Sequence, residues 1–137
     1  MVIADTSAIL ELVDPEAPHH ETILGVFKTQ RRHWILPWAI LAEVDYHLLK
    51  RHGPRAERAF VDDIAAERLR VEWGSEADLV RAGELNQQYS DLKLGLVDGV
   101  VMAVAERLNA DAIATLDVRH FGAVELRGKP KLLPRDV

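Results

Sequence analysis

The stretch GLVDGVVMAVAERLNADAIATLDVRHF, residues 95–121, carries the pattern that determines the fold. Its first half has the i, i+3, i+4, i+7, i+11 spacing of a helix face that packs on a core, from Val97 to Leu108. Asn109 closes this helix, because asparagine readily adopts the left-handed conformation that follows a helix end. Residues 112–114 are then a compact apolar strand, followed by Thr115 and Asp117. The stretch therefore predicts a helix that leads directly into a buried strand.

The same alternation of short apolar strands and helices continues through the rest of the chain. Strands are predicted over residues 2–4 and 69–73, and helices over 6–13, 17–29, 37–52 and 55–67 and after a cap at Ser75. Short strands that are apolar on both faces and alternate with helices favour a parallel sheet covered by helices. We therefore expect an α/β fold, a three-layer α/β/α domain with a central parallel sheet.

Length and composition set further bounds. With 137 residues and 48% apolar side chains, the chain can bury one core, so we expect a single domain over residues 1–137. It has no cysteine, so any metal must be held by oxygen or imidazole. No secretion signal is visible, and the longest apolar run, residues 35–42, is far shorter than the roughly 20 residues of a membrane span. We expect a cytoplasmic protein with no membrane partner.

Four acids stand at positions where open α/β sheets present a ligand cleft. Asp5 and Asp117 follow the carboxyl ends of predicted strands. Glu43 and Asp98 fall on the flanks of the apolar stripes of their helices, where each can line a cleft against the sheet edge. Each acid also has an ordinary structural explanation: a cap or turn for Asp5 and Asp117, the helix dipole for Asp98, and a solvated helix face for Glu43.

Together the four acids favour a metal site. Carboxylates crowded into one cleft repel one another unless a cation neutralises them. Oxygen ligands of this kind suit Mg²⁺, with Mn²⁺ as a possible alternative, and the matching chemistry is phosphodiester hydrolysis. The net charge of -5 does not exclude a nucleic-acid partner, because the 18 acids outside the cluster nearly balance the 17 basic residues.

Four segments in order resemble the PIN-domain family. They are VIADTSAIL (2–10), PWAILAEVDYHL (37–48), GLVDGVVMAVAERL (95–108) and ATLDVRHF (114–121), and the resemblance extends from residue 2 to about residue 124. The four acids of these segments stand where the family has its metal site and catalytic centre: Asp5, Glu43, Asp98 and Asp117. By the same resemblance, Ser7 and Thr115 are supporting hydroxyls.

The chain is most similar to the small VapC-like toxins of type II toxin–antitoxin systems. This resemblance implies a Mg²⁺-dependent endoribonuclease that cleaves RNA, is inhibited by a VapB-like antitoxin and forms a homodimer. Among basic residues that could contact RNA phosphates, which include Arg31, Arg32 and Lys93, Arg119 is the best candidate because it lies two residues from Asp117.

Three other functions are weighed against this one. The chain could be an inactive PIN fold that binds RNA or protein, or a housekeeping RNA-processing nuclease; all four acids are present, which disfavours an inactive copy. Asp5 could instead be a covalent nucleophile for phosphotransfer, but position 7 is serine where a partner carboxylate would be expected. A dinucleotide cofactor has no support, because no G-x-G-x-x-G follows the first strand.

Overall fold

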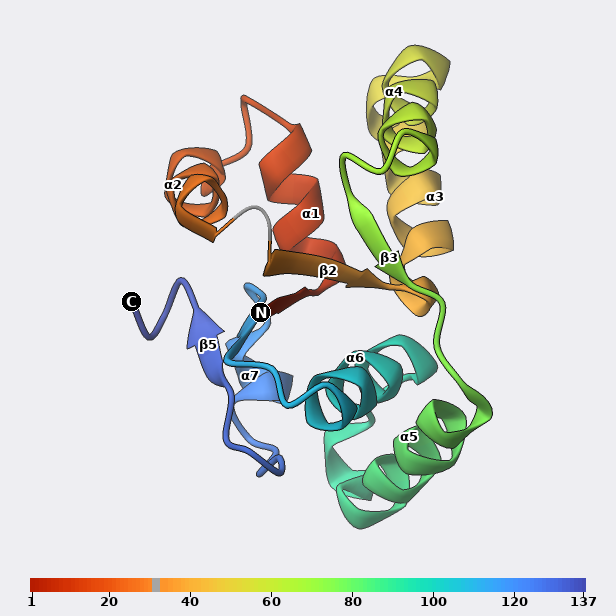
Figure 1. Ribbon diagram of the computed structural model, residues 1–137, viewed down its shortest axis with the longest axis vertical. Helices are drawn as coiled ribbons and strands as arrows, with labels where there is room; N and C mark the ends of the chain where they lie inside the picture. The colour runs from red at the N-terminus through yellow and green to blue at the C-terminus, as the bar shows by residue number, and fades with distance from the viewer. Residues whose placement is uncertain (31–32) are drawn as a thin grey trace.

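The computed structural model describes residues 1–30 and 33–137, and it has the alternating strands and helices that the sequence predicts (Figure 1). The phosphate contacts predicted for Arg31 and Arg32 fall outside these residues. No helix within the described ranges is long and apolar enough to cross a membrane.

Five parallel strands form one sheet in the order β3-β2-β1-β4-β5. Their bounds are β1 Val2–Ala4, β2 Trp34–Pro37, β3 Arg70–Glu72, β4 Ala112–Ala114 and β5 Lys131–Leu133. The central strand β1 is in register with both neighbours, so that Ile3 lies opposite Ile35 in β2 and Ile113 in β4. Every residue of β1, β2 and β4 is buried, as expected for a sheet covered on both faces.

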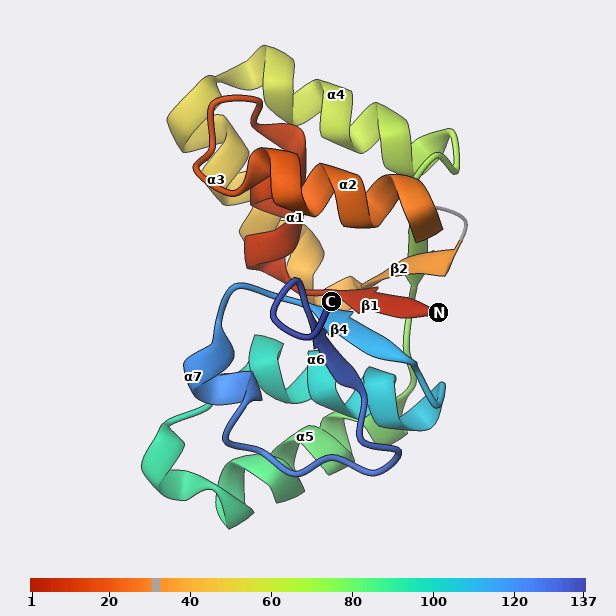
Figure 2. The ribbon, with the colours of Figure 1, turned by 90° about the vertical axis from the view of Figure 1, so that its left-hand side faces the viewer.

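Helices cover the sheet in two layers, which confirms the three-layer α/β/α architecture (Figures 1 and 2). One layer holds α1 Thr6–Val13, α2 His20–Gln30, α3 Leu41–His52 and α4 Pro54–Ala65. On the other side lie α5 Glu76–Gln88, α6 Leu96–Arg107 and the short α7 Val118–Phe121. The helices therefore cover the two faces of the sheet and leave the ends of its short strands open.

Helix α6 joins the second layer to the core. The apolar stripe predicted from the sequence is buried, with Val100, Val101 and Val104 fully inaccessible to solvent. Helix α5 packs closely on α6 at Gly99, where an added Cβ would lie 2.9 Å from the Cβ of Ala82. This close contact fixes the start of α6, which is the turn that carries Asp98.

The structure differs from the sequence-based prediction around Pro37. We expected a helix to begin there, but Pro37 is the last residue of β2, and α3 begins at Leu41 after a 3-10 turn over Trp38–Ile40. The apolar run of residues 35–42 crosses this boundary without a break, so hydrophobicity alone does not divide strand from helix. Strand β5 and helix α7 were also not predicted, because three and four residues are too few to show a recognisable periodic pattern.

Candidate metal centre

The pairing of β1 with β4 brings Asp5 and Asp117 to the same edge of the sheet. Ala4 lies opposite Ala114 at the carboxyl ends of these strands, and the Asp5 backbone N–H donates to the Ala114 carbonyl at 2.9 Å. Two residues that are more than one hundred positions apart in the sequence therefore leave the sheet side by side. This is the edge at which parallel α/β sheets bind their ligands.

Hydroxyl groups hold the Asp5 carboxylate in place. Thr115 Oγ1 donates to Asp5 Oδ2 at 2.8 Å, and Ser7 Oγ donates to the same oxygen at 3.3 Å. The two hydroxyls are themselves fixed by the backbone, since Leu116 N–H donates to Ser7 Oγ at 2.9 Å and Asp117 N–H donates to Thr115 Oγ1 at 3.0 Å. Ser7 and Thr115 thus contact the carboxylate that the sequence analysis assigned them to support.

The other two acids come from the first turns of helices. Glu43 lies in the first turn of α3, which follows the carboxyl end of β2, and Asp98 lies in the first turn of α6. Helix N-termini favour negative charge through the helix dipole, which partly offsets the cost of placing acids together. The structure places ligand atoms of Asp98 and Asp117 within 4.8 Å of one another. Asp5 and Glu43 are not part of this close group, but each is coupled to Asp98 through its charge.

The pKa values of two acids are raised by burial and by the charges of neighbouring acids. The pKa of Asp5 is raised to about 6: burial is the largest cause and the charge of Asp98 adds to it, whereas hydrogen bonds from Thr115, the Thr6 backbone and Ser7 act in the opposite direction. Burial also raises the pKa of Asp98, and the charges of Asp117 and Glu43 add to this effect. The site therefore carries negative charge that is only partly balanced by the protein.

His120 is a member of the cluster that the sequence analysis did not identify. Its Nδ1 lies 2.8 Å from Asp117 Oδ2 and 3.7 Å from Asp98 Oδ2, and its backbone N–H donates to Asp117 Oδ1 at 3.1 Å. The available signal was its position three residues after Asp117, because residues at i and i+3 share one face of a helical turn. Without a longer helical pattern in residues 118–121, this spacing was not recognised.

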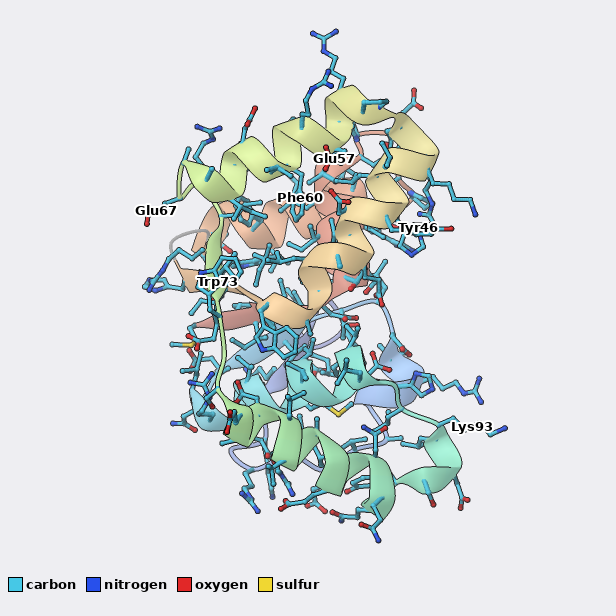
Figure 3. The ribbon with its side chains drawn as sticks, turned by 90° about the vertical axis from the view of Figure 1, so that its right-hand side faces the viewer. Tyr46, Glu57, Phe60, Glu67, Trp73 and Lys93 are labelled. Atoms are coloured by element: carbon cyan, nitrogen blue, oxygen red, sulfur yellow. The ribbon has the colours of Figure 1, made fainter. Side chains whose placement is uncertain are left out.

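The basic residues predicted to meet RNA are exposed near these elements. Arg119 lies on α7, two residues beyond Asp117. Lys93 follows the 3-10 turn Ser90–Leu92 in a left-handed backbone conformation, and its side chain projects away from the molecule (Figure 3). Neither position is buried, so both side chains are accessible to a large ligand.

The donor set fits a hard divalent cation. Asp5 forms no ion pair within the described part of the chain, and single ligand atoms of Asp98, Asp117 and His120 lie within 4.8 Å of one another. Carboxylate oxygens with room for water are the ligands that Mg²⁺ and Mn²⁺ prefer. Asp98, Asp117 and His120 are the group that could hold such an ion. The charge of Glu43 acts on Asp98, and that of Asp98 acts on Asp5.

A parallel sheet with acidic side chains beyond the carboxyl ends of its strands is an arrangement that a metal-dependent nuclease can use. The sequence profile of the PIN domain matches residues 2–125, and the chain belongs to the PIN domain family. The resemblance predicted from four sequence segments is thereby confirmed, and so is the prediction of a nuclease.

Individual relatives point in the same direction. The ribonuclease VapC26 of Mycobacterium tuberculosis is 28% identical over 123 residues, which are 90% of this chain and 91% of that protein. The crystal structure of M. tuberculosis VapC20, a toxin that cleaves the sarcin-ricin loop, superimposes with a TM-score of 0.79 at 22% identity, over 93% of this chain and 99% of that one. The DNA-bound VapBC of Salmonella typhimurium gives a TM-score of 0.70 at 17% identity, covering 96% and 95%. The two structures show a shared fold.

Proposed function

We propose that this chain is a divalent-metal-dependent endoribonuclease and the toxin of a VapBC-type toxin–antitoxin pair. The observation that carries the proposal is the close approach of Asp98 and Asp117, together with the buried Asp5 whose pKa the charge of Asp98 helps to raise. The family and the ribonuclease relative supply the reaction class, which is hydrolysis of RNA phosphodiester bonds. The proposed enzyme is one PIN domain over residues 1–137 that acts in the cytoplasm.

In this proposal the four acids, including Glu43, hold Mg²⁺, and Mn²⁺ can replace it. A bound divalent ion supplies Lewis acidity toward the phosphate and lowers the pKa of a coordinated water. The chain's own contribution is to orient the acids: the hydroxyls of Ser7 and Thr115 both donate to the same oxygen of the Asp5 carboxylate. Arg119 is proposed to contact a phosphate of the RNA, because it is exposed on the helix that begins after Asp117.

The proposed partners follow from the toxin assignment. Solved relatives are complexes of a VapC with its VapB partner, including complexes bound to DNA. We therefore expect a VapB-like antitoxin that inhibits the nuclease, and a homodimer of this chain. Co-purification with the protein encoded beside the gene, and light scattering of the isolated chain, would test these two expectations.

The direct test of the proposed activity is an RNA cleavage assay on the Asp98→Asn variant. Asparagine keeps the shape of the side chain but removes a charged metal ligand, so cleavage with Mg²⁺ should fall by about 100-fold or more, since loss of merely outer contacts to a metal costs 10- to 100-fold. Asp62→Asn is the matched control, because Asp62 is an exposed aspartate on α4. It should cleave like the wild type.

Melting temperature and circular dichroism, measured on the same preparations, separate activity from folding. The wild type should lose cleavage when the divalent ion is chelated and regain it when Mg²⁺ is returned. A folded Asp98→Asn variant that cleaves at the wild-type rate would refute the role of Asp98. Cleavage by pure wild type in the presence of chelator would refute the metal-dependent reaction.

A further inference from the structure

We propose that His120 is a nitrogen ligand of the metal site and makes the site prefer Mn²⁺ over Mg²⁺. The inference rests on the proposed metal-dependent function. It adds to the four acids a fifth residue, whose donor atom is nitrogen instead of oxygen. Acidic ligands alone suit Mg²⁺ as well as Mn²⁺, whereas imidazole is a ligand of transition metals.

The imidazole nitrogen occupies a ligand position between two carboxylates. His120 Nδ1 lies 2.8 Å from Asp117 Oδ2 and 3.7 Å from Asp98 Oδ2. Around an octahedral ion with metal–ligand distances of about 2.1 Å, adjacent ligand atoms are about 3 Å apart and opposite ones about 4.2 Å apart. The distance to Asp117 is therefore close to that of adjacent ligands, and the distance to Asp98 lies between the values for adjacent and opposite ligands.

Local structure keeps the ring in this place. Asp117 is the N-cap of α7 and accepts from the His120 backbone N–H, which fixes the turn between the two residues. The next residue, Phe121, is buried in the core and anchors the helix from the other side. The His120 side chain is only 24% exposed, so the ring has little freedom to turn away from the two carboxylates.

Without an ion, the short contact between Nδ1 and Asp117 is an ordinary hydrogen bond. Ligation requires that the proton reside on Nε2 instead, so that the Nδ1 lone pair can face the ion; neutral imidazole has both tautomers available. Mg²⁺ gains little from this nitrogen because it binds oxygen and keeps its waters. Mn²⁺ accepts both donor types, so the nitrogen strengthens Mn²⁺ binding selectively.

The experiment uses Mn²⁺ alone as the probe, added to metal-free wild-type protein. Pulsed electron paramagnetic resonance of bound Mn²⁺ should show modulation from a directly coordinated ¹⁴N nucleus. In His120→Asn, which keeps a hydrogen-bond donor beside Asp117, Mn²⁺ should still bind but the ¹⁴N modulation should vanish. The control His19→Asn removes an exposed histidine near the start of α2 and should leave the signal intact.

Calorimetric titration adds a measure of selectivity. The ratio of Mn²⁺ to Mg²⁺ affinity should fall about 10-fold in His120→Asn, the lower end of what one supporting group contributes to a metal site. Wild-type protein that binds Mn²⁺ without a ¹⁴N signal would overturn the ligand assignment while leaving the proposed function intact. Wild-type protein that binds neither ion would overturn both.

Discussion

Two regions of the molecule bury carboxylates, and they differ in whether a cationic side chain pairs with the buried negative charge. In the α5–α6 layer, Asp78 is only 2% exposed, and Arg107 donates to it from Nε at 2.7 Å and from Nη2 at 3.0 Å. The Ser75 backbone N–H donates to the same carboxylate and completes a capping box. At the sheet edge, Asp5 is 5% exposed, and from the residues that the structure describes it receives only hydroxyl and backbone hydrogen bonds.

The neighbouring pair in the α5–α6 layer repeats the first pattern. Arg81 donates to both carboxyl oxygens of Glu106, at 2.6 and 3.1 Å. Burial alone would raise the pKa of Glu106, but hydrogen bonds from Arg81 and the Arg127 backbone hold it below its usual value. At the sheet edge the pKa values of Asp5 and Asp98 are raised instead. Removing the cation from a balanced acid would leave a buried charge unpaired, whereas the unbalanced acids are the ones that we propose serve a ligand.

The largest loss of stability should come from removing a cation that pairs with a buried acid in the α5–α6 layer. Arg107→Met keeps the length of the side chain but leaves the buried Asp78 without its cation, which should cost about 3 kcal/mol of stability. This corresponds to a drop of about 6–10 °C in melting temperature. Ribonuclease activity per folded molecule should be retained, because Arg107 lies at the other end of α6 from Asp98.

Arg135→Met serves as the control for this substitution. Arg135 pairs with Asp136 at the surface near the chain end, and such exposed pairs contribute little to stability. Its melting temperature should stay close to that of the wild type. If Arg107→Met were as stable as Arg135→Met, the contrast between the balanced and the unbalanced region would be lost.

A stabilising substitution is expected in the second region. The pKa of Asp5 is about 6 in the folded protein against an ordinary value of 3.8, a difference worth up to about 3 kcal/mol. The folded state thus binds more protons than the unfolded state between these two pH values, so stability from this group is lost as the pH rises from about 4 through 6. Metal-free Asp5→Asn should therefore be more stable than the wild type at pH 8.

Chemical denaturation at several pH values tests the predicted direction of this change in stability. The advantage of Asp5→Asn should shrink as the pH falls and disappear below about pH 4, where Asp5 is protonated in both states. The same variant should be inactive toward RNA. An Asp5→Asn protein that is less stable than the metal-free wild type at pH 8 would show that the Asp5 charge is compensated after all.

The smallest expected effect concerns the hydroxyls that hold Asp5. Thr115→Val removes the donor at 2.8 Å from Asp5 and should lower Mg²⁺ affinity about 10-fold, as loss of outer contacts to a metal ligand does. Thr29→Val is the control, because the Thr29 hydroxyl donates to the Val26 carbonyl on α2. Calorimetry should show unchanged affinity for Thr29→Val. Equal affinity in both variants would contradict the supporting role of Thr115.

The sequence predicts the parts of the fold that carry a long pattern. Helix α6 is predicted because its apolar spacing continues for twelve residues, and β1 and β4 because a polar residue follows each short apolar run. Strand β2 is not predicted, because Pro37 suits both a strand end and a helix start and only pairing with β1 decides between them. Strand β5 has three residues and is specified by its pairing with β4.

The candidate site, like the fold, is predictable from the sequence only in part. The topology of a parallel sheet predicts that Asp5 and Asp117 meet, because both follow strand ends. The detailed contacts are not predictable from the sequence. The hydrogen bond from Thr115 to Asp5 and the approach of the His120 ring to Asp98 depend on side-chain packing at the ends of the strands. A resemblance to a family with four acids gave no reason to look for an imidazole.

The central claim is that the sheet-edge acids are arranged for a divalent cation, and the melting temperature of metal-free protein at increasing Mg²⁺ tests it most directly. A ligand that binds only the folded state stabilises it by about 2.7 kcal/mol at 100 times its dissociation constant. The wild-type melting temperature should therefore rise with Mg²⁺, and with Mn²⁺, while that of Asp98→Asn should not. A wild-type melting temperature that stays constant with both ions, or a rise that is equal in Asp98→Asn, would contradict the account.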